Sequence, residues 1–375
     1  MSKVVVHVAE VAVSQATGMG RVAYHWRRAF QERGFEFIHL GPTETGRLMH
    51  PTLFPWAAYA AYKRSGIKAD LFLVHEPAAG NFVGRGTPTF VFSHGLERRA
   101  AELQIRDRVP TSLLARIKGR LTAPLWKLRS SSCDRGLRGA TAALLINRED
   151  VEYAISHCQL PPEKIWVFRN GVNPVSGGRV RFPDTPCQVL FLGSWLKRKG
   201  TETLARAAAI LHERGIRLKW MLAGTGLERD AVIAQWPTEL IDSTVIIPCF
   251  APDQEAELLA GSSIFVLPSF FEGQPLALLE AMVWGCCCIT SDCCGQKDLI
   301  NDRQTGLLHT PGDAEGLARL IEECAEDREL RQRLGRSAAI SVEGRTWDVV
   351  SGEVVSYVES VMDKIDRGRV ATRVP

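Results

Sequence analysis

Short apolar runs alternate with longer amphipathic stretches through the first half of the chain. Residues 21–33 and 148–157 carry apolar side chains three or four positions apart, which predicts helices with one buried face. The apolar runs between such stretches are short enough for strands, and they cover residues 4–8, 35–40, 71–75, 89–93, 142–147 and 165–168. This alternation is typical of βαβ units built around a parallel sheet.

The same alternation restarts after a segment rich in turn residues. Glycine, proline and asparagine cluster between positions 172 and 186, which indicates a linker. Beyond it, strands are predicted at 188–193, 218–223, 244–248, 264–268 and 287–291. Helices are predicted at 201–214, 276–284 and 313–325. Apolar residues three or four positions apart predict a last helix over about 347–366.

These patterns predict an α/β protein with two Rossmann-like doubly wound domains that face a central cleft. The first domain covers 1–174 and the second covers 182–346, and the helix at 347–366 is expected to pack back on the first. A length of 375 residues suits two domains. Ligands are expected at the carboxyl ends of the strands.

Composition narrows the class of protein without naming a function. Apolar residues make up 45% of the chain and charged residues 23%, which is ordinary for a soluble protein. The run at 4–8 is expected to be a buried strand rather than a signal peptide, and no apolar segment is long enough to span a membrane. Five of the ten cysteines fall within 286–288 and 293–294, where we expect core packing rather than zinc binding. A reducing cytoplasm is the expected compartment.

The stretch from Pro268 to Met282 is the strongest candidate for chemistry. A strand is predicted to end near Pro268 and a helix to begin near Pro275, whose ring suits a first helical position. Free backbone N–H groups and the positive dipole end at such a helix start would bind an anion or a sugar hydroxyl. Glu272 precedes the helix, and Glu280 lies roughly 7 Å along its axis. The two carboxylates would therefore bind two separate hydroxyl-bearing groups of one long ligand.

Three cations follow the first strand of the second half. Lys197, Arg198 and Lys199 stand just before Gly200 and a predicted helix. A diphosphate leaving group gains negative charge as its bond breaks, and fixed cations would stabilise that charge in the transition state.

The Glu, seven residues, Glu spacing resembles the motif of retaining GT-B glycosyltransferases, most closely of glycosyltransferase family 4. The resemblance implies that Glu272 and the backbone after it hold the donor sugar, that Glu280 holds the ribose, and that Arg198 and Lys199 hold the diphosphate. The residues that follow Glu272 are Gly273, Gln274, Pro275 and Leu276. Many members place an arginine after the strand glycine where this chain has Ser194; some lipopolysaccharide-core transferases share that departure.

The resemblance also implies roles for less specific positions. Gly18 and Gly20, in a glycine-rich loop after the first strand, would face the donor phosphate and the acceptor. His94, at the end of the strand 89–93, would lie near the donor sugar. The pair His75 and Glu76 ends the preceding strand in a similar way. The loops that border the nucleobase would contain Gly224, Thr225 and Phe250.

These features together predict a retaining transferase of nucleotide-sugar type. A UDP- or GDP-sugar would be the donor, a glycan, lipid-linked glycan or other hydroxyl compound the acceptor, and no metal or other cofactor would be required. The resemblance also implies that the donor's own diphosphate helps to take the acceptor proton, without an enzyme nucleophile. Two alternatives stay open: an epimerase or phosphorylase on the same fold, and a non-catalytic nucleotide-sugar-binding protein.

The basic segment 97–138 carries 11 Lys and Arg against 4 Asp and Glu, a local charge of +7 in a chain of net charge +4. Between 112 and 138 apolar and basic residues interleave, which suits contact with the anionic inner face of the cytoplasmic membrane or with an acceptor. A helix with a solvated basic face is the alternative. No nucleic-acid-binding motif is present, so nucleic acid is not an expected partner.

Overall fold

The computed structural model describes residues 2–15, 18–46, 48, 50–107, 113–175, 187–251 and 253–371, with the backbone alone at 104–107, 113–123 and 369–371. The chain divides into two compact units, Met1–Asn170 with Trp347–Pro375, and Gly171–Thr346. The chain enters the second unit near Val172 and leaves it near Thr346. These two segments lie side by side, because Val172 pairs with Thr346 in a β-bridge and the Val172 N–H donates to the Arg345 carbonyl.

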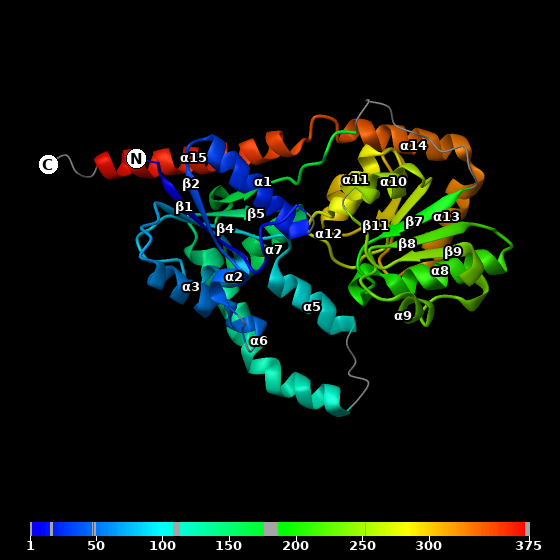
Figure 1. Ribbon diagram of the computed structural model, residues 1–375, viewed down its shortest axis with the longest axis horizontal. Helices are drawn as coiled ribbons and strands as arrows, with labels where there is room; N and C mark the ends of the chain where they lie inside the picture. The colour runs from blue at the N-terminus through cyan, green and yellow to red at the C-terminus, as the bar shows by residue number, and fades with distance from the viewer. Residues whose placement is uncertain are drawn as a thin grey trace. The chain divides into compact units, whose positions relative to one another are not determined.

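A six-stranded parallel sheet forms the centre of the first unit, in the order β2-β1-β3-β4-β5-β6 (Figure 1). Its strands are β1 (Val4–Val8), β2 (Glu36–Leu40), β3 (Leu71–His75), β4 (Thr89–Phe92), β5 (Ala142–Leu145) and β6 (Ile165–Val167). β1, β3, β4 and β5 are almost fully buried, as expected for strands covered on both faces. The predicted strands are confirmed, with ends that differ by at most two residues.

The longer helices of this unit are α1 (Gly18–Glu32), α3 (Phe54–Ser65), α5 (Glu97–Asp107), α6 (Leu113–Gly139), α7 (Arg148–Cys158) and α15 (Trp347–Ala371). Shorter elements are α2 (Pro42–Thr45), η1 (Pro51–Leu53), α4 (Glu76–Ala79) and η2 (Pro162–Lys164). The amino-terminal part of α6 projects away from the sheet of its own unit (Figure 1).

Helix α15 returns to the first unit and packs against α1. The Trp347 ring stacks on His25 with centroids 4.5 Å apart, and Tyr357 stacks on Trp166 at 4.7 Å. Trp347, Val350, Val354 and Val358 are at most 4% exposed, so α15 buries the face that the apolar spacing predicts.

The second unit also contains a six-stranded parallel sheet, in the order β12-β11-β10-β7-β8-β9. Its strands are β7 (Gln188–Leu192), β8 (Lys219–Ala223), β9 (Thr244–Ile247), β10 (Ile264–Leu267), β11 (Cys287–Ser291) and β12 (Leu307–His309). The helices are α8 (Thr201–Glu213), α9 (Arg229–Ile233), α10 (Gln254–Ala260), α11 (Leu276–Val283), α12 (Cys294–Leu299), α13 (Ala314–Glu326) and α14 (Arg328–Ser341), with 3-10 turns η3 (Lys197–Lys199) and η4 (Thr238–Ser243). The expected α/β fold with two doubly wound sheets is thus confirmed. Strand β12 and helices α9, α10, α12 and α14 were not predicted.

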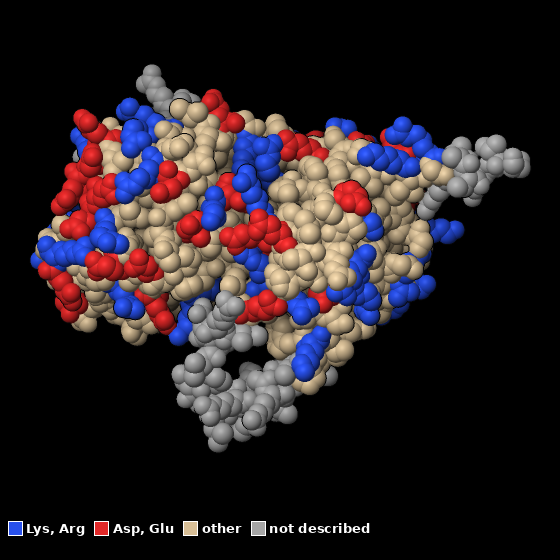
Figure 2. All heavy atoms as spheres, turned by 180° about the vertical axis from the view of Figure 1, so that it is seen from behind, with Lys and Arg blue, Asp and Glu red and all other residues tan. Residues whose placement is uncertain are grey.

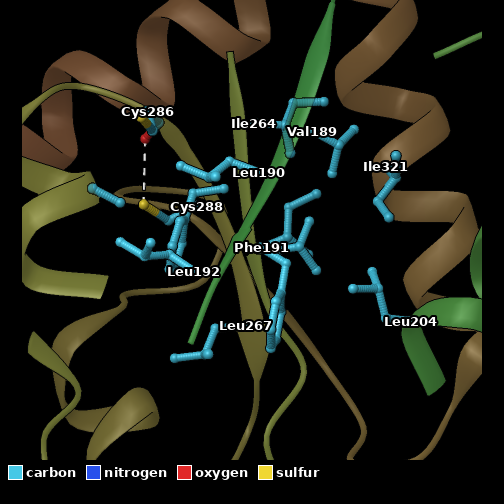
Figure 3. Close-up of a cluster of buried hydrophobic side chains, with 14 of the residues drawn as sticks. Val189, Leu190, Phe191, Leu192, Leu204, Ile264, Leu267, Cys286, Cys288 and Ile321 are labelled. Atoms are coloured by element: carbon cyan, nitrogen blue, oxygen red, sulfur yellow. Dashed lines mark hydrogen bonds between the residues drawn. The ribbon is translucent and has the colours of Figure 1, made fainter. Parts of the chain in front are cut away.

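The core of the second unit lies where β7 and β10 meet the helices (Figure 3). Val189 and Phe191 of β7 lie on the side of Leu204 of α8 and Ile321 of α13, whereas Leu190 and Leu192 lie on the other side of the sheet, near Cys288. The expected core role of the cysteines is confirmed, because Cys286, Cys287 and Cys288 are at most 2% exposed. Burial raises the pKa of the Cys286 thiol to about 12, so it stays protonated at neutral pH.

Candidate functional site

The strand order of the second sheet creates one switch point, between β7 and β10. From β7 the chain continues outward to β8 and β9 on one side, and from β10 it continues to β11 and β12 on the other. The loops that follow β7 and β10 therefore leave the sheet in opposite directions, and the space between them is the usual ligand site of doubly wound sheets. Both candidate sequence clusters follow these two strands.

The cation turn after β7 is locked against the loop after β10. Gly200, which ends η3, has φ +73, and a Cβ there would lie 1.9 Å from the Pro268 carbonyl oxygen. Only glycine permits both this backbone conformation and this approach. The Phe270 N–H also donates to the Arg198 carbonyl at 2.8 Å. The backbone thus brings the cations of one loop to the carboxylate of the other.

Glu272 is the carboxylate at this junction. Its Oε1 lies 2.5 Å from the Lys199 Nζ and 3.9 Å from an Arg198 guanidinium nitrogen. Glu272 and Lys199 are largely buried, whereas the Arg198 side chain is 38% exposed. Two cations against one carboxylate leave a local positive charge that faces solvent mainly through Arg198. The sequence assigned Glu272 and the cations to separate parts of a ligand, but it did not predict that they pair with each other.

Helix α12 supports the Glu272 loop from behind. The Gly295 N–H donates to the Glu272 carbonyl at 3.1 Å, and a Cβ at Gly295 would lie 1.6 Å from the Gly273 carbonyl oxygen. The buried Gln296 amide donates to the Leu267 carbonyl at 2.9 Å. Sequence reasoning missed both α12 residues; their only signal was a glycine and a polar residue a few positions after a buried strand.

The helix start after Glu272 differs slightly from the prediction. Pro275 is the N-cap residue, with φ −70 and ψ 121, and α11 begins at Leu276, so the expected first-turn position for the proline is wrong by one residue. Its extended ψ keeps Pro275 outside the helix. The Gln274 side chain accepts a hydrogen bond from Arg345 at 2.5 Å. Gly273 and Leu276 flank these two residues in the same turn.

Glu280 lies in the middle of α11 and lines a pocket of about 320 Å³. Residues of α10, including Glu255, line the same pocket. Glu272 lies in the loop before α11 and Glu280 inside that helix, and the binding of separate groups of one ligand by the two carboxylates stays a prediction. A long ligand could contact both.

Gly224, Thr225 and Phe250 come together at the ends of β8 and β9. A Cβ at Gly224, which has φ +68, would lie 3.0 Å from the Phe250 ring. The Thr225 hydroxyl is buried and donates to the Leu227 carbonyl at 2.9 Å, while the Thr225 carbonyl accepts from the Trp195 N–H. The Thr225 side chain therefore stabilises the loop that contains it, and the Phe250 ring packs over Gly224.

Polar side chains also gather at the carboxyl edge of the first sheet. His94 follows β4 and contacts the rings of Trp26, His75, Phe92 and Phe168. Burial lowers the pKa of His94 and of His75 to about 3, so both imidazoles are neutral at pH 7. His94 thus lies in an aromatic cluster of the first unit.

Glu76 is the most perturbed carboxyl group of this edge. It is 1% exposed, and its Oε2 accepts hydrogen bonds from the Ser93 hydroxyl and the Glu97 N–H. Burial raises the pKa of Glu76 to about 8 in spite of these contacts. The sequence singled Glu76 out only by its position after a strand.

The glycine pair after β1 is not in a loop. Gly18 and Gly20 lie in the first turn of α1, so the prediction of a glycine-rich loop at these positions is wrong. The Gly20 carbonyl accepts from the Ser14 N–H, and the Arg21 guanidinium donates to the Gln15 carbonyl. These contacts hold Ser14 and Gln15 against the start of α1.

The basic segment lies only partly within the described residues. Its backbone forms α5 and α6, but residues 108–112 and the side chains of 104–123 lie outside them. Arg129 is buried and pairs with Glu10 and Glu97, whereas Trp126 and Leu128 are exposed. On the face drawn in Figure 2, both signs of charge are interspersed.

The described residues contain no helix that is long and apolar enough to cross a bilayer. In the same residues, no group of three or more His, Cys, Asp or Glu side chains is arranged to hold a metal ion.

Residues 178–340 match the model of the family Glycosyl transferases group 1. The lipopolysaccharide core biosynthesis glycosyltransferase LpsE of Rhizobium meliloti (strain 1021) is 34% identical over 154 residues, which are 40% of this chain and 44% of that protein. The aligned segments cover 42% to 57% of the curated relatives, so the chain spans about half the length of the relatives it matches.

Solved structures match nearly the whole chain. Sucrose-phosphate synthase from Thermosynechococcus elongatus has a TM-score of 0.77 at 17% identity, over 96% of this chain and 100% of that chain. Anabaena Alr3699/HepE, solved in complex with UDP and glucose, has a TM-score of 0.65 at 14% identity, over 95% of this chain and 99% of that chain. At these identities the likeness shows the shared two-domain GT-B fold.

Proposed function

We propose that this chain is a retaining glycosyltransferase of family 4 type, which moves a sugar from a nucleotide-sugar donor to a hydroxyl group of a glycan or lipid-linked glycan. The observation that carries the proposal is the cluster of Arg198, Lys199 and Glu272 at the switch point of the second sheet. All three lie within the segment that matches Glycosyl transferases group 1. The fold shared with a protein solved with UDP and glucose supports the donor class.

The cluster carries one net positive charge before a donor binds. A diphosphate brings two negative charges or more, so it competes with Glu272 for Lys199 and for Arg198. When the diphosphate pairs with the Lys199 ammonium, the ion pair between Lys199 and Glu272 breaks. The Glu272 carboxylate can then accept a hydrogen bond from a hydroxyl group of the donor sugar. Binding the diphosphate and positioning the sugar are therefore coupled through one ion pair.

The remaining contacts follow from the same turn. The backbone N–H groups of Gly273, Gln274 and Leu276 are at the start of α11, where they would favour a hydroxyl oxygen or an anion; Pro275, between them, has no N–H. Glu280 would accept the ribose hydroxyls. Gly224, Thr225 and Phe250 would border the nucleobase, largely through backbone groups. Each part of a nucleotide sugar then has a partner in one unit.

The reaction requires that the enzyme stabilise the leaving diphosphate; it does not require a nucleophilic side chain of the enzyme. The bond between the sugar carbon and the diphosphate oxygen breaks, and the acceptor oxygen bonds to the same face of that carbon. The acceptor proton passes to a diphosphate oxygen, so charge and atoms balance without a covalent enzyme intermediate. Arg198 and Lys199 would stabilise the negative charge that the diphosphate gains, and no metal is needed in this scheme.

The first unit would bind the acceptor. His94 is proposed to contribute there as a neutral hydrogen-bonding group, because burial lowers its pKa to about 3 and it carries no charge at pH 7. Gly18 and Gly20 would keep the α1 start accessible to phosphate or acceptor. A growing lipopolysaccharide core is the acceptor class that the LpsE relative suggests, and the relatives WcaL and AmsK, named for colanic acid and amylovoran biosynthesis, suggest a growing surface polysaccharide.

We also propose a cytoplasmic location with peripheral contact to an anionic membrane. In the described part of α6, Trp126 and Leu128 are exposed on either side of Lys127. An exposed tryptophan and a lysine suit the interface of an anionic bilayer. Sedimentation with vesicles of phosphatidylglycerol and phosphatidylcholine tests this, and equal binding by a W126A/L128A variant would contradict it.

Donor binding and turnover test the proposed function. The purified chain is mixed in turn with UDP-, GDP- and ADP-glucose, and unfolding temperature and release of nucleoside diphosphate are both measured. Binding only to the folded state should raise the unfolding temperature by several degrees at saturation. Turnover should rise when octyl glycosides or a membrane extract supply hydroxyl acceptors. If none of the donors shifts the unfolding temperature, the proposal fails.

A further inference from the structure

A short chain of hydrogen bonds holds the turn that contains His94. The Glu76 Oε2 accepts a hydrogen bond from the Ser93 hydroxyl at 2.9 Å, and the Ser93 hydroxyl oxygen accepts one from the Gly95 N–H at 3.3 Å. Ser93 and Gly95 are the residues directly before and after His94. One buried carboxyl group therefore fixes the chain on both sides of this histidine.

The same carboxyl group also sets the path of the chain from β4 to α5. The Glu97 N–H, at the start of α5, donates to the Glu76 Oε2 at 3.1 Å. Between the two contacts Gly95 has φ +130, a backbone conformation that favours glycine. The turn at His94 thus has a fixed beginning and a fixed end, with a glycine between them.

Helix α5 has a second anchor that does not depend on Glu76. Asp150 of α7 accepts hydrogen bonds from the Leu96 N–H at 3.3 Å and from the Arg99 guanidinium at 2.8 Å. The start of α5 is therefore held even without Glu76. The Ser93 hydroxyl, in the part of the chain that the structure describes, contacts only Glu76 and the Gly95 backbone. The specific effect of Glu76 is therefore on the His94 turn.

Glu76 is an unusual residue for a position that is only 1% exposed. Burial raises its pKa to about 8, so at neutral pH it is protonated and forms neutral hydrogen bonds rather than an ion pair. An apolar side chain would fill this position without the cost of removing a carboxyl group from water. Departures from simple core packing are expected mainly at functional sites.

The His94 imidazole depends on this turn for its position. Its ring contacts those of Trp26 and Phe168, with centroids 6.3 and 5.6 Å apart. Within the described residues, no hydrogen bond reaches its ring nitrogens. Ring packing limits how the imidazole tilts, but no polar contact of these residues holds its nitrogens. Their position is therefore set by the backbone between Ser93 and Gly95.

We infer that Glu76 is a positioning residue for His94, which it holds through Ser93 and Gly95 so that the imidazole meets a hydroxyl group of the reacting sugars. The inference rests on the proposed function, because that function makes His94 a neutral hydrogen-bonding group of the site. Glu76 is too deeply buried to contact a ligand itself. A shift of about 1 Å in a positioned group can lower turnover by about 100-fold, so loss of this contact should be visible in the rate.

Turnover of S93A and E76L tests the inference. Release of nucleoside diphosphate is measured from UDP-, GDP- and ADP-glucose, with octyl glucoside or a membrane extract as acceptor. S93A removes the central hydroxyl and should lower turnover by about tenfold; E76L keeps a similar size without an acceptor and should lower it by about 10- to 100-fold. Calorimetric affinity for UDP, GDP and ADP should stay within about twofold of the wild type, because Arg198 and Lys199 belong to the other unit.

S132A is the matched control, and E76Q is the conservative variant. Ser132 is 1% exposed in the same unit, and its hydroxyl has no hydrogen-bond partner among the described residues. Turnover of S132A should therefore stay within about twofold of the wild type. A glutamine amide oxygen accepts the same two hydrogen bonds as the protonated Glu76, so E76Q should recover the turnover that E76L loses to within about threefold of the wild type.

A double variant that includes His94 separates positioning from general destabilisation. H94F keeps a ring in the aromatic cluster but has no ring nitrogen, and it should lower turnover by about 100-fold. Adding S93A to H94F should lower turnover by no more than about a further twofold, because the Ser93 hydroxyl acts through an imidazole that is already absent.

Normal turnover in S93A and in a folded E76L would overturn the inference, and S93A decides alone if E76L does not fold. Losses that multiply in H94F/S93A would show that Ser93 acts on stability rather than through His94, which also overturns it. Both results leave the proposed transferase intact. Absence of turnover of all three donors by the wild-type chain would instead overturn the proposed function, and the inference with it.

Discussion

The Lys199 Nζ lies 2.5 Å from the Glu272 Oε1, although the two residues belong to loops that follow different strands. The loops are held together by backbone contacts that do not involve either side chain. The N–H of Phe270 donates to the Arg198 carbonyl, and Gly200 is packed against the Pro268 carbonyl. The ion pair therefore occupies a site that the backbone has already built, and a ligand can replace one partner without unfolding the loops.

Replacing Glu272 by glutamine should separate diphosphate binding from sugar transfer. The variant removes the negative charge that competes for Lys199, so calorimetry should show a nucleoside diphosphate binding about equally or up to about tenfold more tightly. Sugar transfer should fall by about 100-fold, because the carboxylate that positions the sugar is absent. Weaker diphosphate binding together with normal transfer would contradict the coupling.

Replacing Gly200 by alanine should destabilise the second unit. The new Cβ would overlap the Pro268 carbonyl oxygen, and the backbone has φ +73, so we expect a loss of more than about 3 kcal/mol in the free energy of unfolding. Urea unfolding measures this loss.

Gly215→Ala is the matched control. Gly215 has φ +81 but no neighbouring atom within 4 Å of a Cβ, so only the backbone cost of about 1 kcal/mol should appear. If the two variants lose the same free energy, the close approach at Gly200 does not contribute.

Replacing Glu76 by glutamine should stabilise the first unit at alkaline pH. Burial raises the pKa of Glu76 to about 8 from 4.5. The stability that the protonated carboxyl provides is fully present below pH 4.5, and it is lost as pH rises toward 8 because the unfolded chain ionises first. The free energy of unfolding of the variant should therefore increase relative to that of the wild type as the pH rises, by up to about 1.4 kcal/mol per pH unit in this window.

Urea unfolding at pH 5 and pH 8 compares the two proteins. His75 and His94 have lowered pKa values in both, so their loss of stability below pH 6.5 cancels in the difference. If the free energies of unfolding of variant and wild type differ by the same amount at pH 5 and at pH 8, the assignment of a buried, protonated Glu76 is contradicted.

The strands other than β12 were predictable because each contains a short apolar run, although only the inner strands are buried on both faces; the edge strands β2, β6 and β9 are partly exposed. Gly18 and Gly20 were placed wrongly in a loop, since two glycines at a helix start look like a turn when the neighbouring contacts of Ser14 and Arg21 are unknown. The Glu272 and Lys199 pair was not predictable at all. It depends on the strand order, which brings β7 next to β10. It also depends on the close packing of Gly200 against the Pro268 carbonyl, which the sequence does not show.

The central claim is that Lys199 stabilises the leaving diphosphate, and turnover of two lysine variants tests it most directly. Lys197 lies two positions earlier in η3, its side chain is 80% exposed, and it pairs with Glu202, so Lys197→Ala is the matched control. With a donor identified by binding, Lys199→Ala should lower turnover by about 100- to 1000-fold, while Lys197→Ala should stay within about twofold of the wild type. Near-normal turnover in a folded Lys199→Ala variant would contradict the account.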